Sequence, residues 1–180
     1  EFITDFRSGL INLAAVETSG IDFRVDYGFE LAKLVDTDGR IEFTINGTNF
    51  LKNDEVRDVS APDEVTDVLG TFGRPEWIVN MSADYIIGEL VVGWRGRYEG
   101  SQLLPGLENQ DIESDPDFIS QTHTGSALVH DFSVSYTFED SLEVYGGINN
   151  AFEEDPYLGT LSRPAGPRGR FFYLGVNYTM

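Results

Sequence analysis

The residues of this 180-residue sequence with the most suggestive spacing for chemistry are four acids in one segment. Asp111, Glu113, Asp115 and Asp117 occupy every second position of the acidic stretch 103–124. Hard carboxylate oxygens at such spacing could bind Ca²⁺, but the turn glycine and the distal glutamate of an EF-hand loop are missing. We therefore predict a solvated, acidic loop here, with Ca²⁺ binding as the alternative.

Histidine, serine and cysteine provide no catalytic arrangement. His123 and His130 are seven positions apart and have no third ligand at a recognised spacing, which argues against zinc. Ser133 and Ser135 alternate with apolar residues and lack the glycine pattern of a nucleophile elbow. The chain contains no cysteine, so neither a disulfide nor a thiolate metal site can form. We predict that the protein is not an enzyme and carries no cofactor.

The overall charge and hydropathy narrow the class of protein. A net charge of −19 argues against a nucleic-acid partner, because neutralising phosphates requires clustered Lys and Arg. No apolar run approaches the length of a transmembrane helix, whereas a membrane β-barrel dilutes its apolar residues with an alternating polar set. The sequence starts at Glu1 without an initiator Met or a signal peptide, and we expect it to be a truncated piece.

Apolar and polar residues alternate strictly along much of the chain. From Ile21 to Leu31 every odd position is apolar, while Asp22, Arg24 and Asp26 fall between them. Because a strand points successive side chains to opposite faces, this period predicts a long strand with one apolar face. Comparable rows predict seven strands in all, with room for an eighth in residues 1–16: 12–31, 41–53, 77–85, 90–98, 128–138, 142–148 and 171–180.

The connections between these strands alternate in length. Short turns are expected at 32–39, 87–89 and 139–141, and long loops at 54–73, 103–124 and 149–167. Short connections on one side and long ones on the other are typical of outer-membrane barrels, as are aromatic residues at both ends of an apolar row. The same rows would also suit the core faces of a soluble β-sandwich or a lipocalin-like barrel, which is the alternative fold.

The segment 146–180 contains an ordered set of residues. Asn149, Asn150, Phe152 and Pro156 form its first part, and Arg170, Tyr173, Gly175, Tyr178 and Met180 form its second. This order resembles the C-terminal end of TonB-dependent outer-membrane receptors, although Ala151 replaces the usual Leu and Met180 replaces the usual terminal Phe. The resemblance also implies that these nine residues form the terminal motif that the barrel assembly machinery recognises, with the last strand pairing through its backbone.

The resemblance implies an all-β fold, an antiparallel transmembrane β-barrel segment with long extracellular loops and short periplasmic turns, within a larger 22-stranded barrel. Residues 1–180 would be the C-terminal portion of the receptor barrel in the outer membrane of a Gram-negative bacterium, and the plug domain would be absent from this chain. The implied function is TonB-energised uptake of a scarce nutrient of the siderophore, cobalamin or oligosaccharide class. A small complete barrel that serves as a structural anchor or adhesin is the alternative.

Such a receptor would contact outer-membrane lipid and lipopolysaccharide, its own plug domain and, through the plug, TonB. The period-two register places one set of side chains away from the barrel axis: Phe23, Val25, Tyr27, Trp77, Val79, Leu90, Val92, Trp94, Val134, Tyr136, Leu174 and Val176. The opposite face carries the charges expected in the lumen: Asp22, Arg24, Asp26, Glu30, Asp84, Arg95, Arg97 and Asp131. These charges could contact the plug or line a solute path, or could simply be solvated.

Overall fold

The computed structural model describes residues 15–33, 38–104, 122–139, 141–157 and 169–179. Within them the chain forms strands and one short 3₁₀ helix, η1: β1 (Ala15–Glu30), η1 (Leu31–Lys33), β2 (Arg40–Val56), β3 (Val65–Asp67), β4 (Trp77–Ile87), β5 (Leu90–Glu99), β6 (Ala127–Phe138), β7 (Leu142–Asn149) and β8 (Phe171–Tyr178). All strands belong to one sheet, which confirms the all-β prediction.

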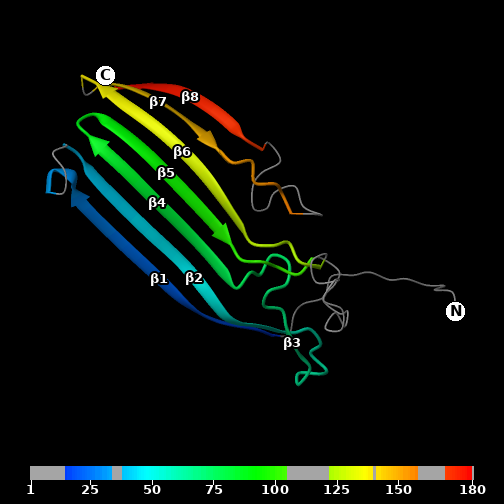
Figure 1. Ribbon diagram of the computed structural model, residues 1–180. Helices are drawn as coiled ribbons and strands as arrows, with labels where there is room; N and C mark the ends of the chain where they lie inside the picture. The colour runs from blue at the N-terminus through cyan, green and yellow to red at the C-terminus, as the bar shows by residue number, and fades with distance from the viewer. Residues whose placement is uncertain (1–14, 34–37, 105–121, 140, 158–168, 180) are drawn as a thin grey trace.

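The seven long strands lie in chain order, each antiparallel to the next (Figure 1). The order is β1-β2-β4-β5-β6-β7-β8, and β3 attaches to the end of β2. β1 and β8 occupy the two edges, and in the described residues they do not pair with each other. The seven rows of alternating residues in the sequence therefore correspond to the seven long strands.

The cross-strand register collects the apolar rows on one face, which we call the apolar face. Val25 lies opposite Ile45, Ile45 opposite Met81, and Met81 opposite Gly96. Residues that lie opposite each other in neighbouring strands point to the same side of the sheet. The face of each side chain can therefore be assigned from one strand to the next across the whole sheet. All twelve residues predicted to share a face do share it, and the alternating polar residues form the opposite, polar face.

Nothing in the described residues covers the apolar face. The exposed fraction is 57% for Val25, 63% for Tyr27 and 81% for Leu174. Large continuous apolar patches of this kind are rare on soluble proteins and mark a surface that contacts a partner or lipid. The soluble β-sandwich alternative is therefore wrong, because these rows do not form a core between two packed sheets.

Aromatic residues stand at both ends of the apolar rows. Trp77 and Phe23 make an edge-to-face contact at the end near the long loops, with ring centroids 6.4 Å apart. Tyr136 and Phe138 lie 4.5 Å apart at the other end. From Trp77 to Tyr85 the strand rises about 27 Å, which, after the tilt of barrel strands, matches the apolar band of an outer-membrane barrel.

Connection length alternates as predicted. Gly88 and Glu89 alone join β4 to β5, and Gly88 has a φ of 53°, as the first position of a type II′ hairpin turn requires. The β6–β7 turn also begins with a positive φ, 49° at Glu139. The long connections leave and rejoin the strands at the opposite end of the sheet from the short turns, and their described parts are residues 57–76 (which include β3), 100–104, 122–126, 150–157 and 169–170 (Figure 1).

One predicted loop is partly a strand. Residues 54–73 were expected to be irregular, but β2 continues to Val56 and β3 pairs with its last three residues. Asp54 lies opposite Asp67 and Val56 opposite Val65. The polar composition concealed this pairing, because β3 has only three residues and no apolar face to reveal a period of two.

A β-bulge interrupts the β1–β2 ladder between Ser19 and Gly20. Gly20 pairs with Phe50 and Ser19 with Lys52, so Leu51 is the extra residue. A bulge of this type bends the strand and increases its local twist. It lies where the apolar face ends, one position beyond the pair formed by Ile21 and Asn49.

Beyond the bulge the apolar face becomes charged. Lys52 Nζ lies 2.7 Å from the carboxylate of Glu17 and 3.2 Å from that of Asp54. The outer parts of β1 and β2 therefore carry an ion network on the side where the rest of the sheet is apolar.

In the part of the chain that the structure describes, no helix is long and apolar enough to cross a bilayer.

Candidate functional site

The buried side chains gather at the loop-bearing end of the sheet. Val68, Val129 and Tyr157 are almost fully inaccessible, although they come from a loop, a strand and a second loop. Val129 lies opposite Arg97 on the polar face, so the loops cover the polar-face side at this end. We call the described loop segments 68–76, 100–104, 122–126 and 150–157 the rim.

Gln102 joins three parts of the rim and is fully buried. Its Oε1 accepts a hydrogen bond of 2.7 Å from the backbone N–H of Gly73, and its Nε2 donates one of 3.2 Å to Glu99. Its backbone N–H donates to the hydroxyl of Thr124 at 3.1 Å. A buried amide with its polar atoms bonded in this way holds the separate loops in one arrangement.

Backbone hydrogen bonds complete the rim. The N–H of Leu103 donates to the carbonyl of Gly70 at 2.8 Å, and that of Leu104 donates to the carbonyl of Thr122 at 2.7 Å. Leu103 also forms isolated bridges with Thr71 and His123. The rim is thus a small extension of the sheet, and its stability does not depend on side chains alone.

Replacing Gln102 by leucine should loosen the rim without unfolding the sheet. The change removes two side-chain hydrogen bonds, each with a net stabilisation of about 0.5–1.5 kcal/mol. Hydrogen–deuterium exchange should show faster exchange of the Gly73 amide and unchanged exchange of β4. Ser126→Ala, which changes an exposed serine on the same rim, is the control. Unchanged protection of Gly73 in the Gln102 variant would contradict this role.

A buried acid fixes another part of the rim to β2. Glu55 is 4% exposed, and its Oε2 lies 3.3 Å from Nε of Arg57. Its other carboxylate oxygen accepts a hydrogen bond from the guanidinium of Arg74. Because a buried carboxylate requires such partners, this arrangement connects the end of β2 to the segment that precedes β4.

Tyr157 occupies the interior of the rim, with its ring edge-to-face against Phe72 at 6.5 Å. Burial raises the pKa of Tyr157 to about 12, and the carboxylate of Glu99 adds to the shift. The phenol therefore remains protonated and uncharged at neutral pH. Its location shows that the loop after β7 contributes a side chain to the same small core as Gln102.

The structure brings together the two parts of the predicted terminal motif. Asn149 pairs with Phe171 at the ends of β7 and β8, and Arg170 forms a 2.8 Å ion pair with Glu153. Phe152 is exposed on the apolar-face side, where its ring lies edge-to-face against His130 at 4.9 Å. These contacts explain why the motif residues occur together as a folded corner.

Asn150 forms the centre of that corner. It is 5% exposed and adopts a φ of 50°, a left-handed conformation that asparagine tolerates better than most residues. Its Nδ2 donates to the carbonyl of Glu154 at 2.8 Å, and its Oδ1 accepts from the N–H of Glu154 at 2.8 Å. Its own N–H donates to Asp131 at 2.7 Å.

The second part of the motif lies on β8. Tyr178 pairs with Leu142 on the apolar face, while Tyr173 and Gly175 lie on the polar face. The ring of Tyr145 covers Gly175, where an added Cβ would meet the ring within 2.3 Å. Met180 lies outside the described residues. Recognition of this strand by the assembly machinery, and the role of Pro156, stay predictions.

The eight predicted lumen charges all lie on the polar face. Arg95 Nη1 donates to Asp84 at 2.8 Å across the β4–β5 ladder. Arg24 Nε lies 2.6 Å from Asp26. Asp131 differs from the others because it accepts the backbone hydrogen bond of the Asn150 corner, a role that the sequence pattern did not indicate. Whether these charges contact a plug or a solute stays a prediction.

The acids and histidines considered as metal ligands do not form a metal site in the part of the chain that the structure describes. The alternating acids, Asp111 to Asp117, lie outside the described residues. His123 contacts Thr122, with 2.9 Å between Nδ1 and the hydroxyl oxygen, and His130 accepts a hydrogen bond of 3.0 Å from Trp94. The described residues contain no cluster of three or more His, Cys, Asp or Glu side chains placed to hold a metal.

Sequence reasoning missed the rim residues Gln102, Glu55 and Tyr157. Their partners are between two and 85 positions away and follow no repeating spacing. The only signal available was chemical: Gln102 and Tyr157 are hydrogen-bonding or aromatic residues within otherwise polar loops. That signal alone does not distinguish a buried residue from an exposed one.

Comparison with known proteins agrees with this geometry. Among curated proteins, no significant match to the chain was found. The family described as "TonB dependent receptor-like, beta-barrel" matches residues 2–151, which cover most of the chain and six of the seven long strands. The match includes the strands from β1 to β7 and the rim up to Ala151, and it leaves out β8 and most of the terminal motif. The chain therefore belongs to the TonB-dependent receptor-like β-barrel family.

Proposed function

We propose that this chain forms part of the wall and the extracellular rim of a receptor that takes up a scarce, bulky nutrient with energy supplied through TonB. The family consists of outer-membrane receptors and transporters of Gram-negative bacteria and is not an enzyme family. It is characterised by a plug domain and by interaction with TonB. The nutrient class, the energy source and the location of this chain are the parts that we propose.

The observation that carries the proposal is the asymmetry of the sheet. The uncovered apolar face has the dimensions of a bilayer and suits a surrounding of lipid, and the described parts of the long loops lie at one end of the sheet. The polar face carries charged pairs such as Arg95 and Asp84, which suit a hydrated interior that holds a plug. We place residues 1–180 in the C-terminal part of the barrel and the plug in a separate part of the receptor.

Uptake measurements in cells with and without TonB test this function. Cells that produce the intact receptor should accumulate one of three labelled probes, ferrichrome, cyanocobalamin or maltoheptaose, and should lose that accumulation when TonB is deleted. Accumulation that is indifferent to TonB, or binding to surfaces without uptake of any probe, would favour the anchor or adhesin function instead.

Shortening the longest loop should alter uptake while leaving assembly intact. The 2.7 Å hydrogen bond between Leu104 and Thr122 brings the two ends of segment 105–121 together, so a short Gly-Ser linker can replace it. Outer-membrane levels should be unchanged, and uptake of the transported probe should fall severalfold, because long loops carry ligand contacts in proteins of this architecture. Wild-type uptake by the shortened receptor would show that this loop makes no contribution.

A further inference from the structure

Two adjoining cavities form one groove along β7 and β8. The first has a volume of about 270 Å³ and is lined from Tyr173 to Glu143, and the second, of about 540 Å³, continues to Thr179. Glu143 and Asn177 line both cavities, and Asn177 Nδ2 donates to the Glu143 carboxylate at 3.0 Å. The groove therefore runs along the strands toward the short-turn end of the sheet.

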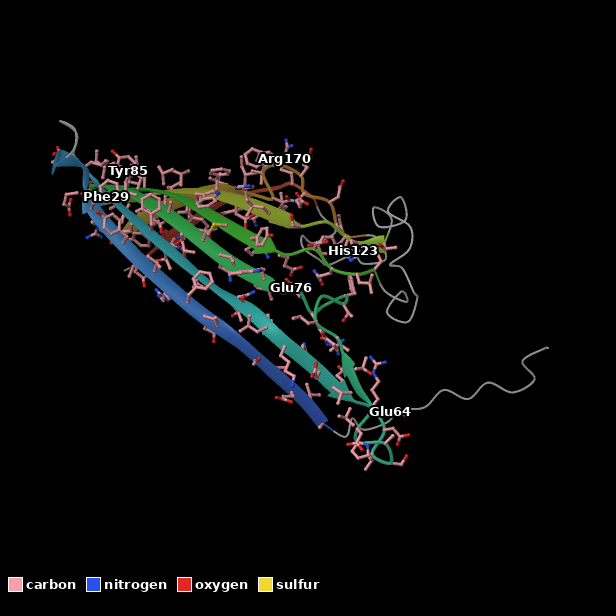
Figure 2. All side chains as sticks on the ribbon, turned by 60° about the horizontal axis from the view of Figure 1, so that its bottom comes forward. Phe29, Glu64, Glu76, Tyr85, His123 and Arg170 are labelled. Carbon is pink, nitrogen blue, oxygen red and sulfur yellow. The ribbon has the colours of Figure 1, made fainter. Side chains whose placement is uncertain are left out.

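The groove lies on the side of the sheet where the lumen is expected. Glu143 lies opposite Asn177, and both belong to the polar face. In Figure 2, Phe29 and Tyr85 mark the short-turn end toward which the groove runs, and Arg170, immediately before β8, lies away from them. The β8 side of the groove is about 20 Å long at the usual rise of a strand. An occupant that fills it must therefore be elongated along the strands.

Two tyrosine rings line the end of the groove that is nearer the loops. Tyr145 lies over Gly175, and an added Cβ at Gly147 would be 2.7 Å from Cζ of Tyr173. The rings thus occupy space that side chains would take at these glycines, and their centroids are 6.4 Å apart. Rings held across a neighbouring strand in this way lie along the sheet, so part of each ring surface is turned toward the groove. Such a surface is apolar and suits the C–H groups of a sugar ring.

Hydroxyl side chains are the commonest lining of the remaining length: Ser133, Ser135, Thr137, Ser141 and Thr179. Among the described residues that line the two cavities, Glu143 alone is charged. Arg95 lies beyond one end of the groove and is already paired with Asp84. The lining can therefore donate to and accept from the hydroxyl groups of a ligand, whereas an anion would meet Glu143 without a compensating cation.

Shape and charge together favour one of the nutrient classes of the proposed function. Cobalamin and ferric siderophores are compact, so a long groove would contact only one side of them, and many ferric siderophores are anionic. A neutral oligosaccharide is elongated, carries hydroxyl groups along its length and has an apolar side on each ring. It matches the length, the tyrosine rings and the hydroxyl lining at once.

We infer that this groove binds an uncharged oligosaccharide and guides it along the inner wall toward the short-turn end. The inference rests on the proposed function, because the proposed barrel places the polar face around the path of the nutrient. Tyr145 and Tyr173 contact the sugar rings, and Glu143 and the hydroxyl side chains bond the sugar hydroxyl groups. A neutral glycan is then the nutrient of this receptor.

Isothermal titration calorimetry of the intact receptor in nanodiscs, which leave both ends of the barrel accessible, tests the inference. The probes are maltohexaose, cellohexaose, xylohexaose and laminarihexaose. At least one should bind, and the disaccharide of the same linkage should bind much more weakly because it covers only part of the groove. Tyr145→Leu and Tyr173→Leu should each raise the Kd of the bound glycan about tenfold, which corresponds to about 1.4 kcal/mol.

Two variants control for general damage to the wall. Tyr145→Phe keeps the ring and should bind the glycan much as the wild type does. Tyr136→Leu makes the same change on the apolar face of β6, opposite Val144, and should leave the Kd unchanged. If a leucine variant in the groove fails to insert, Glu143→Gln replaces it and must weaken binding.

Absence of binding by all four hexasaccharides would overturn the inference, as would an unchanged Kd in the groove variants. Entry of vancomycin into cells that carry those variants, with an unchanged Kd, would show that the groove seats the plug instead. TonB-dependent uptake of ferrichrome or cyanocobalamin without glycan binding would reject the groove and retain the proposed function. Glycan binding without TonB-dependent uptake would retain the groove as a site and reject the proposed function.

Discussion

Asn150→Ala should lower the free energy of unfolding by about 2–4 kcal/mol. The change removes both side-chain hydrogen bonds to the backbone of Glu154 and places alanine at a φ of 50°, where its Cβ is strained. The corner is buried, so water cannot replace the lost bonds. Urea-induced unfolding of the receptor in phospholipid vesicles provides the measurement.

Two further variants separate the causes. Asn150→Gly accepts the left-handed conformation but also lacks the side-chain bonds, so it should recover only the strain, about 1–2 kcal/mol. Asn149→Ala changes the preceding asparagine, which is exposed and holds its place through backbone pairing with Phe171. It should change stability by less than about 0.5 kcal/mol. Equal losses for Asn149 and Asn150 would mean that the corner has no special role.

Ile45→Arg should destabilise the protein by about 2–4 kcal/mol when it is folded into a bilayer. Ile45 lies near the middle of its apolar row, opposite Val25 and Met81, and is 39% exposed. A guanidinium there must enter the hydrocarbon or distort the bilayer around it. Unfolding in phospholipid vesicles should show this loss, and in a detergent with a small, adaptable micelle it should be smaller.

The neighbouring residue supplies the matched control. Asn46→Arg places the same side chain one position away in the same strand, but on the polar face opposite Asn80. Because that face is hydrated in the proposed barrel, the cost should be less than about 1 kcal/mol. A similar penalty at both positions would contradict the assignment of the apolar face to lipid. A larger penalty for the control variant would mean that the polar face, and not the apolar face, contacts lipid.

The long strands of the sheet could be predicted because the alternation of apolar and polar residues is visible within each strand and is repeated in all of them. Ile21, Phe23 and Val25 alternate with Asp22 and Arg24, and a shift by one residue would invert every side chain. Lipid imposes the same requirement on each strand, so the pattern is repeated along the chain. The number of long strands, the shared face and the alternation of short and long connections all follow from it.

The rim could not be predicted for the opposite reason. Gln102 is buried because Gly73 and Thr124 bond it, and neither partner stands at a spacing that a period would reveal. Glu55 looked like a solvated loop acid, yet β2 extends to include it and two arginines neutralise it. Even on the wall, His130 occupies an apolar row, where the indole of Trp94 satisfies its ring nitrogen.

The bulge at Leu51 has a consequence for how such a receptor can evolve. In an uninterrupted ladder, gaining or losing one residue outside the membrane would transfer the error to every side chain below it. An unpaired residue at the boundary absorbs a slip of one position, because the ladder restarts at Gly20 and Phe50. The part of the hairpin beyond the bulge can therefore change length by a residue, while the part along the apolar face keeps its phase.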